Sequence, residues 1–99
     1  MIQIPEWRTE PQQVWIACRQ LRKMGSSDEY LVQFDANGAT YTAFVPARFC
    51  DRQNQALRGS IIADYNDDLL VDLPTETLTS GPRILVRGAE RESVLQEIE

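Results

Sequence analysis

Four aspartates form the densest group of residues with metal-binding or catalytic potential: Asp64, Asp67, Asp68 and Asp72. Carboxylates brought close together can coordinate calcium or magnesium, or share a proton in acid–base chemistry. Their spacing lacks the mid-loop glycine and the terminal glutamate of an EF-hand loop. We therefore interpret Asp67 and Asp68 as the solvated tip of a turn. The sequence predicts no metal site and no bound cofactor.

Nucleophilic catalysis is disfavoured because the chain contains no histidine. Histidine is the usual general base, so a serine or cysteine triad with histidine is excluded within this chain. Cys50 stands between Arg48 and Arg52, and neighbouring cations can favour a thiolate. Without a paired cysteine or a histidine, we interpret Cys18 and Cys50 as small buried thiols and predict that the protein is not an enzyme.

A small basic patch next to aromatic residues suggests a different kind of site. Arg19, Arg22 and Lys23 follow Trp15 closely, and a groove for single-stranded nucleic acid combines such residues. The formal net charge of −5, however, repels polyphosphate at long range. Binding of single-stranded nucleic acid through these four residues is therefore the alternative function, and protein binding is the first.

The elements that must position these residues are strands, and the clearest two meet at Asn37-Gly38. Asn-Gly suits a two-residue type I′ turn because both residues tolerate a positive φ. The turn sets the register and pairs Phe34 with Tyr41 on a face that belongs in a core. The other pairs predicted on that face are Ala36–Ala39, Val32–Ala43 and Tyr30–Val45.

The opposite face of this hairpin is polar near the turn and apolar at its far end, where Leu31 pairs with Phe44. Another part of the chain or a partner must cover these two side chains. The same question arises for Trp7, which lies in an extended, proline-containing arm over residues 1–12. Trp7 either caps the open end of the domain's own core or contacts a partner.

Further strand-like runs follow the pattern of apolar residues. Residues 13–21 are apolar on both faces and predict the first strand, and residues 47–57 predict a helical turn or a short helix. Residues 58–65 and 69–73 flank an Asn-Asp-Asp turn and predict a second hairpin, and residues 83–87 predict a sixth strand. Residues 89–99 have helical spacing and predict a short amphipathic C-terminal helix.

These elements predict a mainly β fold, a small antiparallel six-stranded barrel or sandwich with a short C-terminal helix. The expected organisation is an arm over 1–12, a β-barrel domain over 13–88 and the helix over 89–99. In the second half, Gly-Ser-Ile-Ile-Ala, Asp-Leu-Leu-Val-Asp-Leu-Pro and Gly-Pro-Arg-Ile-Leu-Val resemble one arm of an SH3-like barrel. The style is SH3-like or OB-like, and such a likeness implies no function by itself.

Length and composition fit this class. A chain of 99 residues with 42% hydrophobic and 25% charged residues is expected to form one globular domain. No apolar run is long enough to span a bilayer, and the first residues lack the features of a secretory signal, so the expected compartment is the cytoplasm. Nine of the ten cations are arginine, which favours forked contacts with carboxylates.

We therefore predict a non-catalytic small β-barrel module that binds another protein or forms a homodimer. The prediction rests on the missing catalytic residues and on apolar and aromatic side chains of the kind that dominate binding interfaces. The candidate partner contacts are Trp7, Leu31, Phe44, Val94, Leu95 and Ile98.

Overall fold

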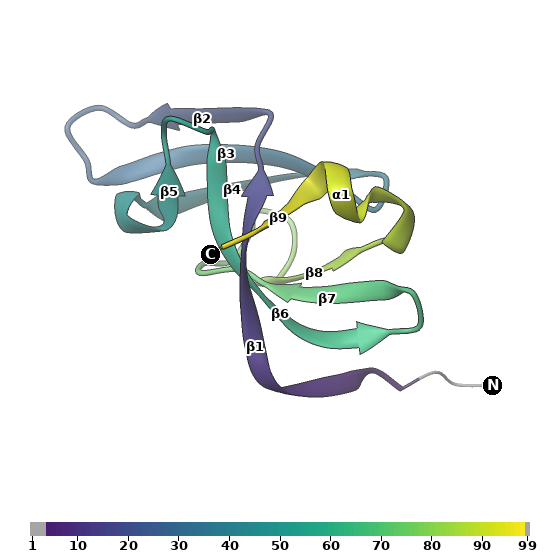
Figure 1. Ribbon diagram of the computed structural model, residues 1–99. Helices are drawn as coiled ribbons and strands as arrows, with labels where there is room; N and C mark the ends of the chain where they lie inside the picture. The colour runs from purple at the N-terminus through teal and green to yellow at the C-terminus, as the bar shows by residue number, and fades with distance from the viewer. Residues whose placement is uncertain (1–3, 99) are drawn as a thin grey trace.

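The computed structural model describes residues 4–98, and strands account for 59% of them. Within these residues, nine strands form two antiparallel sheets, joined by turns, a longer loop over residues 73–82 and one short helix (Figure 1). The predicted mainly β, antiparallel class is confirmed, but the described strands number nine and not six. The strand order of the larger sheet is a linear path, so this sheet is an open half-barrel.

The larger sheet contains the two longest strands, which pair with each other. In spatial order its strands are β8 (Arg83–Val86), β7 (Asp68–Asp72), β6 (Ala56–Tyr65), β1 (Glu6–Ala17) and β9 (Leu95–Glu97), and β5 (Cys50–Asp51) pairs with the start of β6. The register shifts between Trp7 and Gln12 in β1 and between Ile61 and Ala63 in β6. Such irregularities bend a strand and increase its twist, and β1 bends visibly along its length (Figure 1).

The smaller sheet is the predicted hairpin with one additional strand. Its strands are β2 (Gln20–Lys23), β3 (Glu29–Ala36) and β4 (Ala39–Pro46), in that order. All pairs predicted from the Asn37-Gly38 turn are present, and the two turn residues have φ values of 50° and 76°. The rings of Phe34 and Tyr41 stack with their centres 5.4 Å apart. The predicted register and turn are therefore confirmed.

The core lies between the two sheets, which Figure 1 shows one above the other. Both sheets contribute fully buried side chains. The largest of these are Phe34, Ile16, Leu57, Ile61, Ile84, Val14, Val32, Val45, Val71 and Val86. Since these residues come from β1, β3, β4, β6, β7 and β8, neither sheet has a core of its own.

The tip of the small-sheet hairpin is tied to the larger sheet by residues that follow β8. There a 3-10 turn, η2 (Gly88–Glu90), precedes the helix α1 (Arg91–Val94). The Glu90 carboxylate accepts hydrogen bonds from the backbone N–H of Asn37, at 2.7 Å, and of Arg87, at 3.0 Å. The N–H of Gly88 donates to the Asp68 carboxylate at 3.1 Å. These bonds fix the two sheets relative to each other.

Both ends of the chain differ from the prediction. The arm expected over 1–12 is not separate, because Glu6 pairs with Asp64 and Trp7 with Ala63 as the first part of β1; residues 1–3 lie outside the described part. The helix expected over 89–99 is limited to α1, because the chain then pairs with β1 as β9. The described residues contain no helix with the length and apolar character needed to cross a membrane.

Candidate protein-binding face

Strand register defines the face of the larger sheet that is turned away from the core. In β7, Leu69 and Val71 are buried, so the alternate residues Leu70 and Asp72 face outward. Paired residues of neighbouring strands share a face, which extends this assignment across the sheet. We call this surface the outer face, and it comprises Trp7, Gln13, Trp15, Arg58, Ser60, Ala63, Leu70, Asp72, Arg83, Leu85 and Gln96.

Trp7 lies across the outer face and not at the end of the core. Its side chain is 58% exposed, and the Arg83 guanidinium lies 5.3 Å from the centre of its ring system. Arg83 also lies 3.7 Å from the Asp72 carboxylate. Ala63 is fully buried although it faces outward, so its cross-strand neighbours Trp7 and Leu70 must cover it. Of the two roles predicted for Trp7, capping of the core is therefore wrong.

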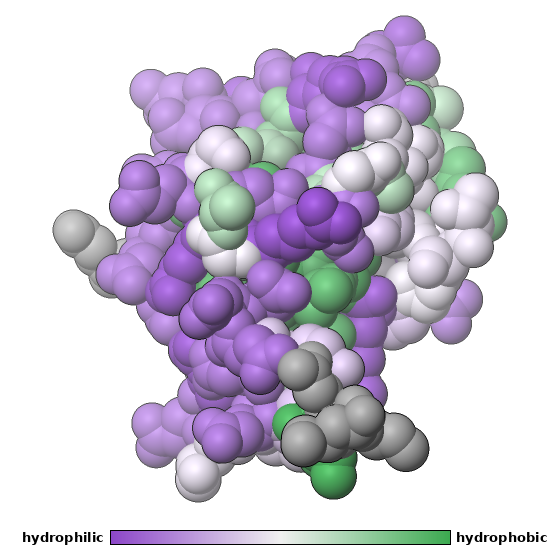
Figure 2. All heavy atoms as spheres, turned by 90° about the vertical axis from the view of Figure 1, so that its right-hand side faces the viewer, coloured by the Kyte–Doolittle hydropathy of each residue, from purple (hydrophilic) through white to green (hydrophobic). Residues whose placement is uncertain are grey.

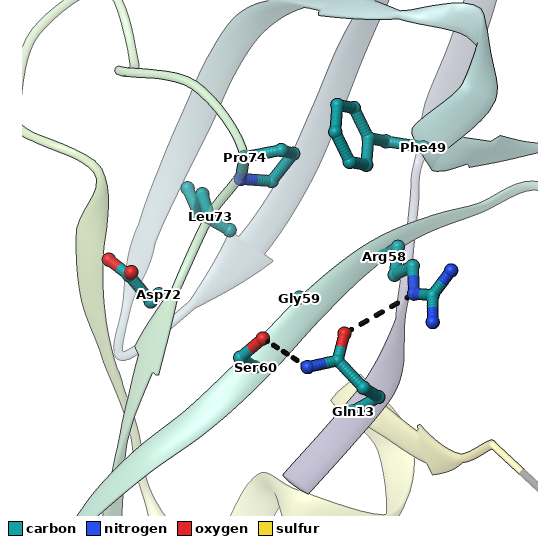
Figure 3. A pocket seen from close by; sticks show the side chains of 8 residues that line it. All are labelled: Gln13, Phe49, Arg58, Gly59, Ser60, Asp72, Leu73 and Pro74. Carbon is teal, nitrogen blue, oxygen red and sulfur yellow. Dashed lines mark hydrogen bonds between the residues drawn. The ribbon is translucent and has the colours of Figure 1, made fainter. Parts of the chain in front are cut away.

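A groove of about 290 Å³ adjoins the middle of the outer face. Its walls come from the 3-10 turn η1 (Ala47–Phe49), from β6 and from the residues after β7. The lining residues are Gln13, Phe49, Arg58, Gly59, Ser60, Asp72, Leu73 and Pro74. Figure 3 shows Phe49 and Pro74 on one side of β6 and Gln13 on the other, with the charged groups of Arg58 and Asp72 towards opposite ends. The groove thus combines an apolar wall with charged ends.

Hydrogen bonds hold the polar side of this groove in place. Gln13 donates from its amide to the Ser60 hydroxyl at 2.7 Å and accepts from Arg58 Nε at 3.3 Å (Figure 3). One edge of β6 is unpaired beside them. β5 pairs with β6 as far as Leu57, and β7 pairs with β6 from Ser60 onwards. No described strand therefore pairs with Arg58 and Gly59 on that edge. The sheet edge is therefore interrupted at the groove.

A second hollow, of about 370 Å³, lies beside the other tryptophan of the outer face. Trp15 pairs with Arg58 of β6 on one side and with Gln96 of β9 on the other. The lining residues are Trp15, Asp51, Asn54, Ala56, Gln96, Glu97 and Ile98. We call it the Trp15 hollow. It differs from the groove in containing two carboxylates and no cationic side chain.

The partner contacts predicted from the sequence do not form one surface. Trp7 is on the outer face, whereas Leu31 and Phe44 pair on the outward side of the smaller sheet, where Phe44 is 41% exposed. The other three belong to the C-terminal segment. Val94 is only 8% exposed and is part of the core, so its prediction as a partner contact is wrong. Its burial follows from the docking of α1 against β1.

The two remaining C-terminal candidates have different surroundings. Leu95 is partly buried and packs against the core, because β9 pairs it with Ile16 of β1. Ile98 follows β9 and lines the Trp15 hollow. Only Ile98 of this segment therefore borders the candidate site.

The structure does not gather the residues of the predicted nucleic-acid patch. Trp15 belongs to the larger sheet, whereas Arg22 and Lys23 belong to β2 in the smaller one. Arg19, between the two strands, forms an exposed ion pair with Asp35 at 2.8 Å. Trp15 therefore lies on a different sheet from Arg22 and Lys23, and Arg19 lies in the connection between the two sheets.

The aspartates of the 64–72 segment have separate structural partners. Asp64 accepts two hydrogen bonds of 2.9 Å from the Arg8 guanidinium, Asp68 accepts from the N–H of Gly88, and Asp72 faces Arg83. The described residues contain no group of three or more acidic, cysteine or histidine side chains placed to hold a metal ion. These carboxylates therefore position strands and turns.

The Asp64–Arg8 pair makes stability depend on pH. The hydrogen bond from Arg8 holds the pKa of Asp64 below its ordinary value of 3.8. The pair therefore contributes above about pH 4 and is lost as the pH falls through the lowered pKa. Replacing Asp64→Asn is expected to lower the free energy of unfolding by about 0.5–1 kcal/mol at pH 7, since the pair is partly exposed, and by less at pH 3. Urea unfolding at the two pH values measures this; an equal loss at both would contradict it.

The two thiols are not activated. Burial, helped by the nearby charge of Cys50, raises the pKa of Cys18 to about 12. Burial also raises the pKa of Cys50, so the thiolate considered for Cys50 between Arg48 and Arg52 is contradicted. The Arg48 guanidinium instead lies 4.7 Å from the centre of the Phe49 ring. The Arg52 guanidinium lies 5.8 Å from the centre of the Tyr30 ring, so both cations pack on aromatic rings.

Figure 2 shows the side of the molecule that lies to the right in Figure 1, and it is largely hydrophilic with only small, separated hydrophobic areas.

Comparison with protein families, curated proteins and solved structures finds no match to this chain. The function proposed below rests on the outer face, the groove and the Trp15 hollow.

Several residues of the candidate site were not predicted from the sequence. They are Gln13, Asp51, Arg58, Arg83 and Glu97, which come from five different strands. An exposed arginine in a strand gives a weak signal, because its partner across the sheet is set by pairing between distant segments. The presence of Trp7 and Trp15 close together near the start of the chain was the one signal that could have indicated a functional outer face.

Proposed function

We propose that the protein is a non-catalytic binding module that holds another protein on the outer face of its larger sheet. One observation carries this proposal: both tryptophans of the chain lie on this face, and each has an arginine beside it. Trp7 is stacked with Arg83, and Trp15 is paired with Arg58. Tryptophan and arginine are the residues most enriched at the energetic centres of protein interfaces.

The shape of the face supports the same proposal. The groove and the Trp15 hollow adjoin the face on either side of the paired residues Trp15 and Arg58. Side chains of a partner can enter both recesses, while Gln13 and Ser60 offer polar groups between them. Binding on this face does not require a closed SH3-like or OB-like barrel, because only the strands from β8 to β9 contribute to it.

The occupant we favour is a segment of a different protein. A phage-displayed library of random peptides is selected on the wild-type protein, and the affinity of the best peptide is then measured for variants. Trp7→Ala is expected to weaken binding at least tenfold, because it removes the large exposed aromatic surface that Arg83 holds in place. Isothermal titration calorimetry gives the affinities.

The matched control is Phe44→Ala, an exposed aromatic residue on the smaller sheet. Its affinity should stay within twofold of the wild type. Loss of binding in Phe44→Ala with no change in Trp7→Ala would place the binding surface on the smaller sheet and refute the proposal. The outer face could instead bind a second copy of this chain. Light scattering between about 10 µM and 1 mM tests this, because a dimer that Trp7→Ala abolishes would show that the copies meet at the outer face.

A further inference from the structure

We infer that Asn37 is a site of spontaneous chemical modification, where loss of ammonia converts asparagine into isoaspartate or aspartate, and that η2 slows this reaction in the folded protein. The modification does not depend on the proposed binding of a partner. Asn37-Gly38 forms the tip of the β3–β4 hairpin, and residues at η2 contact this tip directly. Of the three asparagines in the chain, Asn37 alone is followed by glycine.

The reaction begins when the backbone nitrogen of Gly38 attacks the side-chain carbonyl carbon, Cγ, of Asn37. A bond forms between these two atoms, the bond from Cγ to Nδ2 breaks, and ammonia leaves with the proton of the Gly38 N–H. Water then opens the resulting five-membered imide at one of its two carbonyl carbons. Opening at the original backbone carbonyl gives isoaspartate, in which the chain runs through Cγ, and opening at Cγ gives aspartate.

The surroundings of Gly38 leave its nitrogen open to this chemistry. Gly38 is exposed, and a β-carbon added to it would meet no atom of the described residues within 4 Å, its two chain neighbours apart. At the other two asparagines the attacking nitrogen belongs to Gln55 or Asp67, whose own side chains stand beside it. Since glycine has no side chain to block the approach, Asn37 is the asparagine that reacts fastest in the unfolded chain.

The conformation of the turn opposes the same step. A type I′ turn has a ψ of about +30° at its first residue, and the φ values of Asn37 and Gly38, 50° and 76°, fit this turn. At that ψ, the β-carbon of Asn37 and the nitrogen of Gly38 lie on nearly opposite sides of the bond from Cα to the carbonyl carbon. Ring closure needs them on the same side. The backbone must therefore rotate about this bond, and the hairpin tip must open first.

Two contacts at η2 hold the tip closed. Arg87 donates from Nε to the side-chain oxygen of Asn37, and the Glu90 carboxylate accepts from the backbone N–H of Asn37 at 2.7 Å. Opening the tip breaks both contacts, so they add to the free energy of this local opening. Glu90 gives the clearer test, because the Arg87 cation also withdraws electrons from the carbonyl under attack, which favours the reaction.

Isoaspartate at this position would loosen the connection between the two sheets. It adds one carbon to the backbone of a turn whose register depends on two residues, so the type I′ geometry is lost. It also places a free carboxylate close to Glu90, and like charges repel. The modified protein should therefore unfold at a lower urea concentration than the unmodified protein.

The test incubates the protein at neutral pH and physiological temperature and follows each asparagine by peptide mapping with mass spectrometry, which detects the replacement of NH2 by OH. Asn37 should react at least tenfold more slowly in the folded protein than in the same protein unfolded in urea. In urea it should react faster than Asn54 and Asn66. Equal rates for Asn37 with and without urea, or no reaction at Asn37 in urea, would overturn the inference.

Variants assign the protection to η2. Glu90→Ala should speed up the reaction of Asn37 in the folded protein at least threefold and leave its rate in urea unchanged. The matched control is Glu92→Ala, which removes an exposed carboxylate two residues away in α1 and should react like the wild type. Equal acceleration by both variants would make lost negative charge the cause. No acceleration by Glu90→Ala would show that η2 does not protect the turn.

The other two asparagines separate local opening from general unfolding. If Glu90→Ala accelerates the reaction at Asn37, Asn54 and Asn66 by the same factor, the whole domain is opening and the role of η2 is refuted. Urea unfolding of protein aged until isoaspartate has formed, compared with fresh protein, tests the effect on the two sheets. An unchanged urea midpoint would contradict that effect.

Discussion

Replacing Phe34→Ala is expected to lower the free energy of unfolding by about 3–5 kcal/mol, the range found when a buried aromatic side chain is removed from a core. Phe34 is fully buried and stacks on Tyr41 at 5.4 Å. A domain of this length is stabilised by only about 5–15 kcal/mol. The loss is therefore a large share of the total stability, and urea unfolding at 25 °C measures it.

Phe44→Ala is the control for this prediction because it alters the same hairpin on its opposite face. Phe44 is 41% exposed, so its removal should cost about 1 kcal/mol or less. If the two variants lost similar amounts of free energy of unfolding, Phe34 would be no more buried than Phe44. Such a result would contradict the register that the Asn37-Gly38 turn sets.

The register of the β3–β4 hairpin is the part of the fold that could be predicted from the sequence in detail. An Asn-Gly turn of two residues leaves one way to pair the strands around it, and β3 and β4 contain no bulge. Period-two alternation then identifies Val32 and Phe34 as core residues. Here local geometry and burial agree, and the prediction is correct for each pair.

The larger sheet could not be predicted in the same way. Its two long strands contain irregularities, between Trp7 and Gln12 and between Ile61 and Ala63, and an extra residue turns the following side chains to the other face. Alternation counted along the sequence fails at these points. The position of Trp7 on the outer face therefore depends on pairing with β6, more than 50 residues away along the chain.

In the C-terminal segment, helical spacing of apolar residues competes with strand pairing to β1. Val94, Leu95 and Ile98 fit a helix, but a helix of eleven residues has little stability of its own. Beyond Val94 the chain gains strand pairing with β1 instead, which brings Glu97 to the edge of the Trp15 hollow. The candidate site depends on this tertiary pairing, and for that reason the sequence did not reveal it.

Gly88→Ala is expected to lower the free energy of unfolding by about 1–3 kcal/mol, the cost of forcing an extra methyl group into a packed site. A β-carbon at Gly88 would overlap the backbone carbonyl of Asp67 in the β6–β7 turn. Backbone cannot rotate away as a side chain can, so the turn or η2 must move. The hydrogen bond from Gly88 N–H to Asp68 would be lost with that movement.

Gly81→Ala provides the matched control, because a β-carbon there meets no atom within 4 Å and its backbone needs no positive φ. It should be neutral or slightly stabilising, since alanine restricts the unfolded chain. Chemical unfolding of both variants separates the steric effect from the general change in backbone freedom. A neutral Gly88→Ala would mean that η2 does not pack against the β6–β7 turn. The contacts of Glu90 and Gly88 would then no longer explain how the two sheets are fixed together, and β8, which carries Arg83 to Trp7, would need another support.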